Sequence, residues 1–217
     1  MNKHTEIKYI LFDLDNTLYP ASSRVEYEFN NRIVTYVAKF MGISMEEADE
    51  LRAKGFIEHG TTVSWLIAEH GLTNIEDYLD WIHMKNIGDY ITPNPELTAM
   101  LKRITIPRSI LTNAIREHAD RVLEALGIRH EFEQVFDIRD YNFNNKPSPI
   151  AYKTALSAID VPVENILFID DNIHFMQPFI DLGGQVLLID EEQKHPDSQY
   201  SSIREITELE NFLYPSF

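Results

Sequence analysis

A chain of 217 residues, 44% hydrophobic and 25% charged, has the composition of a globular protein with one or two domains. No apolar run approaches the ~20 residues that a membrane-spanning helix needs. The formal net charge of -16 repels nucleic-acid backbones and anionic membranes, so we expect neither as a partner. The absence of cysteine excludes disulfides and thiolate metal sites. Because no signal-peptide pattern is visible either, we expect a cytoplasmic location.

The first predicted element is a buried strand at residues 7–13, where the apolar run IKYILFD is bounded by polar residues. The stretch that follows, up to about Thr92, has only helical patterns. These lie at residues 25–42, from a capping box at 44–47 onward, at 62–71 and at 74–84. Trp65 and Trp81 fall within them and either pack between helices or line a ligand pocket.

The interruption of the strand pattern predicts two domains. We expect a helical domain at residues 20–91, inserted after the first strand, and a discontinuous core formed by residues 1–19 and 92–217. Pro95, with Asn94 before it, suits the start of the helix that resumes the core.

The rest of the chain alternates short apolar runs with helical patterns. The runs RSILTN, NILFIDD and QVLLID predict strands at 108–113, 165–171 and 185–190. Helical patterns at 116–127 and 149–159 lie between them, and Gly127 is expected to end the first. Strands that alternate with helices of this length indicate an α/β fold with a parallel sheet.

Polar side chains stand where the predicted strands end. The set comprises Asp13, Asp15, Thr112, Asn113, Asp170 and Asp171, with Lys146 before a further helix. Taken singly, the Thr–Asn pair is explained as a helix cap, the lysine as a solvated loop residue and the last two aspartates as a turn. Because ligands in open α/β sheets bind beyond the carboxyl ends of the strands, we expect all of them at one site.

These residue types together predict phosphate chemistry. An all-oxygen set of carboxylates without His or Cys suits Mg²⁺, and a helix N-terminus with a nearby hydroxyl and a lysine suits phosphate. Asp13 would attack the phosphoryl group and form an aspartyl-phosphate. Asp15 would protonate the leaving alcohol and later activate water.

Four motifs in order along nearly the whole chain resemble those of the haloacid-dehalogenase superfamily of phosphohydrolases. They are DLDNT (13–17), LTNA (111–114), Lys146 in NKPSP (145–149) and FIDDN (168–172). The inserted helices are similar to the type-one cap of that superfamily. The resemblance implies a Rossmann-like parallel sheet with helices on both faces and a Mg²⁺-dependent phosphomonoester hydrolase.

The resemblance also implies roles for single residues. Asp13 would be nucleophile and metal ligand, and Asp15 would be acid/base with its backbone carbonyl on Mg²⁺. Asp171 would be the principal metal ligand of the last motif, with Asp170 as its helper. Phosphate would be held by Thr112, Asn113 and Lys146.

The sequence DNTLYP (15–20), with Asn16 and Tyr19, resembles the motif of the pyrimidine 5'-nucleotidase branch. This likeness implies a small phosphorylated substrate such as a pyrimidine nucleoside 5'-monophosphate. No residue of the inserted helices could be matched to a role in specificity.

Other functions remain open at this point. Phosphosugar and phosphoglycolate phosphatases and phosphosugar mutases share the same site residues. A dehalogenase lacks the second aspartate and the metal, and a phospho-receiver module carries its paired acids and its lysine in another order. A catalytically silent binding protein would not need every motif residue. The acidic tail EITELENFLYPSF is expected to form a short helix that closes the core. Alternatively, Leu213, Tyr214 and Phe217 would form a dimer contact, so we expect a monomer or a homodimer.

Overall fold

The computed structural model describes residues 6–59 and 61–215, so Phe217 lies outside the described residues. By its internal contacts the chain divides into two compact units. One comprises Arg24–Asn86, and the other comprises Met1–Ser23 with Ile87–Phe217. The smaller unit falls inside the expected segment 20–91, and its role as a cap stays a prediction.

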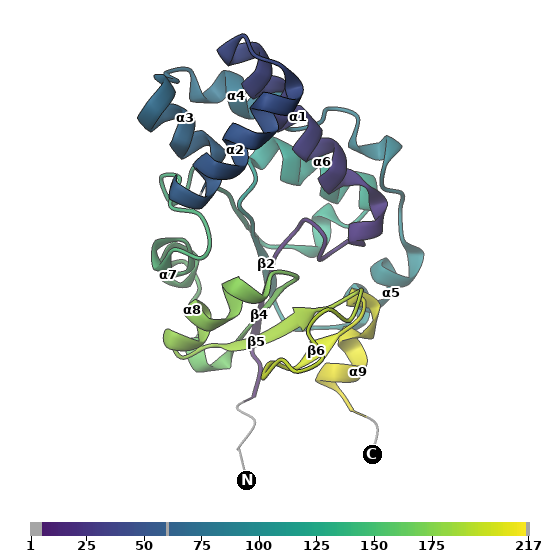
Figure 1. Ribbon diagram of the computed structural model, residues 1–217. Helices are drawn as coiled ribbons and strands as arrows, with labels where there is room; N and C mark the ends of the chain where they lie inside the picture. Colours follow the sequence, from purple (N-terminus) through teal and green to yellow (C-terminus); the bar gives the residue numbers. More distant parts are fainter. Residues whose placement is uncertain (1–5, 60, 216–217) are drawn as a thin grey trace. The chain divides into compact units, whose positions relative to one another are not determined.

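The larger unit contains a six-stranded parallel sheet within the described residues (Figure 1). The strands are β1 (Tyr9–Phe12), β2 (Arg108–Leu111), β3 (Val135–Phe136), β4 (Ile166–Asp170), β5 (Gln185–Ile189) and β6 (Ser202–Ile203), in the order β3-β2-β1-β4-β5-β6. The predicted α/β class with a parallel sheet is therefore confirmed.

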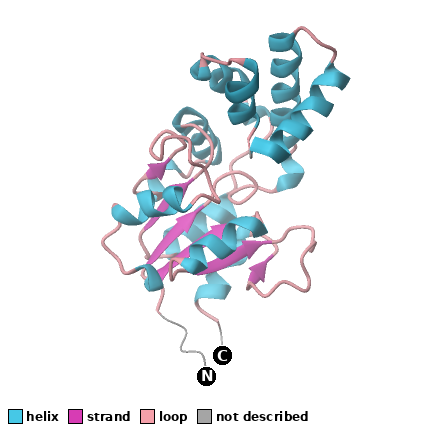
Figure 2. Cartoon of the chain, turned by 60° about the vertical axis from the view of Figure 1, so that its left-hand side comes forward, coloured by secondary structure: helices cyan, strands magenta, loops and turns pink. Residues whose placement is uncertain are grey.

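Helices lie around this sheet (Figure 2). The α-helices are α5 (Pro95–Arg103), α6 (Arg116–Leu126), α7 (Pro149–Ser157), α8 (Met176–Asp181) and α9 (Leu209–Leu213). Short 3-10 turns are η1 (Ala21–Ser23), η2 (Ile87–Asp89), η3 (Arg129–Glu131), η4 (Val163–Asn165), η5 (Ile173–Phe175) and η6 (Ile206–Glu208). As predicted, Asn94 caps α5: its Oδ1 accepts hydrogen bonds from the N–H groups of Glu96 and Leu97, at 3.0 and 3.1 Å.

The helical unit consists of α1 (Val25–Met41), α2 (Met45–His59), α3 (Thr62–His70) and α4 (Ile75–Ile82). Helix α1 packs against α2 and α4, and α2 packs against α3. The last pair approach closely at Gly55, where an added Cβ would lie 2.3 Å from the Trp65 ring. Gly42 ends α1 in a left-handed conformation, with φ 71°, at the end of the helical pattern expected over residues 25–42.

The two tryptophans of this unit differ in their surroundings. Trp65 is buried and its indole N–H donates to Glu69 at 3.1 Å, so it belongs to the core. Trp81 lines a cavity of about 580 Å³ together with Glu28, Arg32 and Lys85. The packing role expected from the sequence holds for Trp65. Trp81 also packs, with the Tyr36 ring centroid 6.2 Å away and Lys39 Nζ 4.5 Å from its own, and a ligand in the cavity beside it stays a prediction. None of the helices in the described ranges is long and apolar enough to cross a membrane.

Candidate active site

The sheet register brings the first and last motifs together. Strand β1 lies between β2 and β4, and Phe12 is paired with both Ile110 and Ile169. The residues that follow, Asp13 and Asp170, are therefore neighbours at the carboxyl edge of the sheet. The N–H of Asp13 also donates to the carbonyl of Ile169 at 2.8 Å, which fixes its backbone there.

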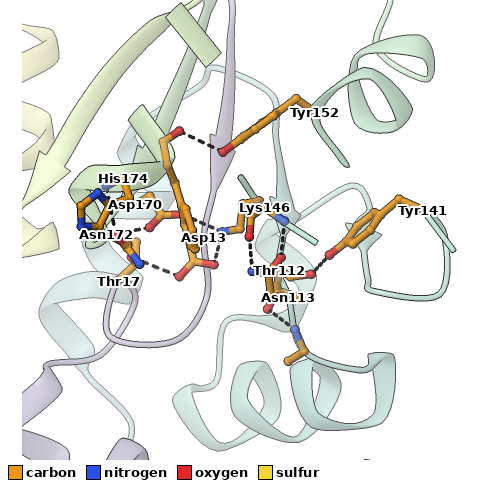
Figure 3. Close-up of polar contacts among 12 residues, drawn as sticks. Asp13, Thr17, Thr112, Asn113, Tyr141, Lys146, Tyr152, Asp170, Asn172 and His174 are labelled. Atoms are coloured by element: carbon orange, nitrogen blue, oxygen red, sulfur yellow. Dashed lines mark hydrogen bonds and ion pairs between the residues drawn. The ribbon is translucent and has the colours of Figure 1, made fainter. Parts of the chain in front are cut away.

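Lys146 binds both of these aspartates. Its Nζ lies 2.6 Å from Asp13 Oδ1 and 2.5 Å from Asp170 Oδ2, and its side chain is 1% exposed (Figure 3). The aromatic rings of Phe168 and Phe175 lie 5.3 and 5.2 Å from the same nitrogen. The ammonium is thus held between two carboxylates in a site from which bulk water is largely excluded.

Asn113 fixes the backbone of this lysine. The Lys146 N–H donates to Asn113 Oδ1 at 2.8 Å, and Asn113 Nδ2 donates to the Lys146 carbonyl at 3.0 Å. Both ends of the carboxamide are therefore used to position the lysine. The backbone N–H of Asn113 and the second N–H on its Nδ2 are further donors, and a phosphate contact by Asn113 stays a prediction.

Thr112 stands at the end of β2 with its hydroxyl in the same site. Its Oγ1 accepts from the Ala114 N–H at 3.0 Å, and the residue is buried. The Tyr141 hydroxyl donates to the Thr112 carbonyl (Figure 3). Because its own hydroxyl proton is a donor, Thr112 is suited to bind a phosphate oxygen.

Electrostatics at the site are dominated by crowded negative charge. Burial raises the pKa of Asp13 well above its usual range; Lys146 opposes this rise, and the neighbouring aspartates add to it. Burial likewise raises the pKa of Asp170. Burial lowers the pKa of Lys146, but attraction to Asp13 and Asp170 outweighs it and raises the value to about 12. The single positive charge of Lys146 therefore does not neutralise the negative charge of the carboxylates around it.

Three carboxylates of this site fit a divalent cation. Ligand oxygens of Asp13, Asp170 and Asp171 all lie within 4.8 Å of one another. Hard oxygen donors without nitrogen or sulfur are those that Mg²⁺ prefers. The structure does not rank the two adjacent aspartates as ligands. Asp170 is fully buried and bonded to Lys146, whereas Asp171 is partly exposed.

Asp15 lies at the edge of the site, and two donors contact one of its oxygens. Oδ1 accepts from the Tyr19 hydroxyl at 2.5 Å and lies 2.8 Å from His118 Nε2. Burial, and then the charge of Asp15, raise the pKa of Tyr19 well above its usual range, so its phenol stays a donor. Asn16, in the turn between them, has φ 59°, a left-handed conformation that asparagine tolerates better than most residues.

Sequence reasoning missed a site role for His118 and Tyr19. His118 is buried on the first turn of α6, the helix that follows the Thr112–Asn113 strand end. A histidine on the apolar face of a helix that starts at the site was the available signal. Asp15 and His118 are 103 positions apart, so no local pattern pairs them.

Comparisons with known proteins agree with this arrangement. A family model for haloacid dehalogenase-like hydrolases matches residues 7–183. Phosphate metabolism protein 8 of Saccharomyces cerevisiae is 27% identical, over 93% of this chain and 71% of that protein. A 6-phosphogluconate phosphatase of Escherichia coli is 23% identical, over 84% of this chain and 82% of that protein. The crystal structure of a HAD phosphatase from Thermococcus onnurineus shares the fold, with a TM-score of 0.70, 18% identity, and coverage of 96% and 98% of the two chains.

Proposed function

The chain belongs to the haloacid dehalogenase-like hydrolase family, and from this premise we propose that it hydrolyses small phosphomonoesters through an aspartyl-phosphate on Asp13. The family match and the phosphatases among its relatives support a phosphatase. The observation that carries the proposal is the position of Lys146 Nζ, 2.6 Å from Asp13 and 2.5 Å from Asp170. A lysine there would offset the charge that a phosphoryl group brings to Asp13.

Asp13 is the proposed nucleophile because it is the carboxylate that contacts both the lysine and the turn after β1. Its Oδ1 binds Lys146, and its Oδ2 lies 3.4 Å from the Thr17 hydroxyl. These contacts set the orientation of its carboxylate plane. Thr112 Oγ1, the Asn113 N–H and Lys146 Nζ would hold the phosphate oxygens.

The proposed cofactor is Mg²⁺, held by Asp13, Asp170 and Asp171 with the backbone carbonyl of Asp15. When bound, it supplies positive charge that lets the carboxylates and an anionic substrate share the site. Asp13 could then stay ionised although burial raises its pKa.

Asp15 favours a phosphatase over a dehalogenase. We assign it to protonate the leaving alkoxide as the phosphoryl group moves to Asp13, and then to take a proton from the water that attacks the aspartyl-phosphate. Displacement of a halide needs no proton donor, whereas departure of an alkoxide does.

For the substrate, we propose a pyrimidine nucleoside 5'-monophosphate. The support is the sequence DNTLYP at residues 15–20, which resembles the pyrimidine 5'-nucleotidase branch. A sugar phosphate is the second candidate, because one relative is a 6-phosphogluconate phosphatase. A panel with UMP, CMP, purine monophosphates, phosphoglycolate and hexose phosphates separates the two. Highest kcat/KM for UMP and CMP supports the first, and turnover of hexose phosphates alone contradicts it.

The activity itself is tested with p-nitrophenyl phosphate. We expect turnover with Mg²⁺ that stops on chelation with EDTA and returns on adding Mg²⁺. Asp13→Asn should remove turnover and keep the fold, whereas Asp160→Asn, the same change at an exposed aspartate, should leave turnover unchanged. Substantial activity of Asp13→Asn would mean that another nucleophile operates, and activity indifferent to EDTA would contradict the Mg²⁺ site.

A further inference from the structure

Two side chains from different elements converge on one oxygen of Asp15. The Tyr19 hydroxyl, four residues later in the same turn, lies 2.5 Å from Oδ1, and His118 Nε2 from α6 lies 2.8 Å from it. The donors are buried: Tyr19 is 4% exposed, and the side chain of His118 is 3% exposed. The side chain of Asp15 itself is 35% exposed, so part of its carboxyl group is accessible to solvent.

The direction of these hydrogen bonds follows from the chemistry of the acceptor. An oxygen that carries no proton can only accept, so both in the ionised carboxylate and in the acid protonated on Oδ2 the phenol and the imidazole Nε2–H donate to Oδ1. Two donors on one oxygen restrain rotation of the carboxylate about its last side-chain bond. A single donor would leave the group free to swing around that contact.

Both donors are themselves held by the fold. His118 stands on the first turn of α6, whose buried face continues with Ala119, Val122 and Leu123. Tyr19 is held in the turn that leaves β1, before η1 begins at Ala21. The orientation of Asp15 is therefore set by two separate elements of the same unit.

We propose that Tyr19 and His118 are positioning residues that fix Oδ1 of Asp15, so that Oδ2 is the oxygen that exchanges protons with the leaving group and with water. This assignment rests on the proposed phosphatase function. In the first step the phosphorus–alkoxide bond breaks, a bond from Asp13 to phosphorus forms, and the alkoxide takes the proton from Oδ2. In the second step water attacks phosphorus, the bond to Asp13 breaks, and Oδ2 takes the proton of the water.

Substrates with different leaving groups distinguish this positioning role from a purely structural one. p-Nitrophenolate is a stable anion and departs without a proton, whereas an alkoxide needs one. The value of kcat/KM reports the step in which the leaving group departs, so it isolates the acid role of Asp15 from its later role as base. A misplaced acid is expected to cost about 10-fold to 100-fold for an alkyl phosphate and little for p-nitrophenyl phosphate.

The experiment measures kcat/KM for p-nitrophenyl phosphate and for the best alkyl phosphate of the substrate panel. The variants are His118→Leu, His118→Gln, which keeps an N–H donor, and Tyr19→Phe, which removes only the hydroxyl. His130→Leu is the control, because the side chain of His130 is 67% exposed in the same unit. Asp15→Asn gives the reference for complete loss of the acid.

We expect His118→Leu and Tyr19→Phe to lower kcat/KM for the alkyl phosphate about 10-fold to 100-fold. The same variants should lower kcat/KM for p-nitrophenyl phosphate by less than about 3-fold. His118→Gln should recover most of the alkyl phosphate activity, and His130→Leu should resemble the wild type. An equal loss on both substrates, or no loss on either, overturns the inference. If His118→Leu does not fold, Tyr19→Phe decides by the same ratio. A wild-type protein that hydrolyses neither substrate contradicts the proposed function instead.

Discussion

Replacing Lys146 with methionine removes the ammonium between Asp13 and Asp170 and keeps a side chain of similar length. Its Nζ lies 2.6 and 2.5 Å from oxygens of the two carboxylates, and the side chains of Lys146 and Asp170 are each 1% exposed. Because water has little access to replace the lost partner, two buried carboxylates are left facing each other. Removing one member of a buried ion pair costs about 3–5 kcal/mol of unfolding free energy.

In a chain of this length each kcal/mol lowers Tm by roughly 2–4 °C, so we expect Lys146→Met to lower Tm by about 6–20 °C. The destabilisation caused by Lys146→Met should become larger as pH rises. The pKa values of Asp13 and Asp170 are raised in the native state, so the stability these groups contribute is present when both are protonated and is lost as pH rises through their native pKa. Without the lysine those pKa values rise further.

Thermal unfolding followed by circular dichroism in EDTA, at about pH 5 and about pH 8, checks this expectation. Lys153→Met, at an exposed position of α7, is the matched control. Adding Asp13→Asn to Lys146→Met should restore part of the lost stability, because it removes one of the two facing charges. A Tm of Lys146→Met equal to that of the control, or a deficit that shrinks as pH rises, would refute the reasoning.

Two further changes test other parts of the molecule. Asp15→Asn should lower kcat for an alkyl phosphate by about 100-fold or more. The affinity for Mg²⁺, measured by calorimetry, should stay unchanged because the backbone carbonyl of Asp15 remains. A loss of Mg²⁺ affinity would mean that the side chain of Asp15 is a metal ligand. Gly55→Ala should destabilise the protein by about 1–3 kcal/mol, because its Cβ would lie 2.3 Å from the Trp65 ring. Gly88→Ala is the control in the same melting experiment, because a Cβ added at Gly88 would have no neighbouring atom within 4 Å. Equal Tm values for the two variants would contradict the packing argument.

The main strands could be predicted because they are buried runs of apolar residues. The runs at 7–13, 108–113, 165–171 and 185–190 contain β1, β2, β4 and β5. Strands β3 and β6 have two residues each, too few for any periodicity, and each lies at an edge of the sheet with one strand as its neighbour. Such strands exist only because the neighbouring strand is already in place.

Part of the site follows from topology alone. Once β1 lies between β2 and β4, the residues after each strand meet at one edge, which brings Asp13, Thr112 and Asp170 together. The approach of Lys146 depends on a loop held by Asn113, and the contact between Asp15 and His118 depends on the packing of α6. Side-chain geometry of this kind has no signature in residue spacing.

Capture of the phosphoenzyme tests the central claim most directly. Protein mixed with its best substrate and quenched in acid within one turnover should carry a single phosphoryl group on the peptide that contains Asp13, labile to hydroxylamine and absent from Asp13→Asn. Substrate turnover without any phosphorylated peptide, or with the phosphoryl group on another residue, would contradict the account.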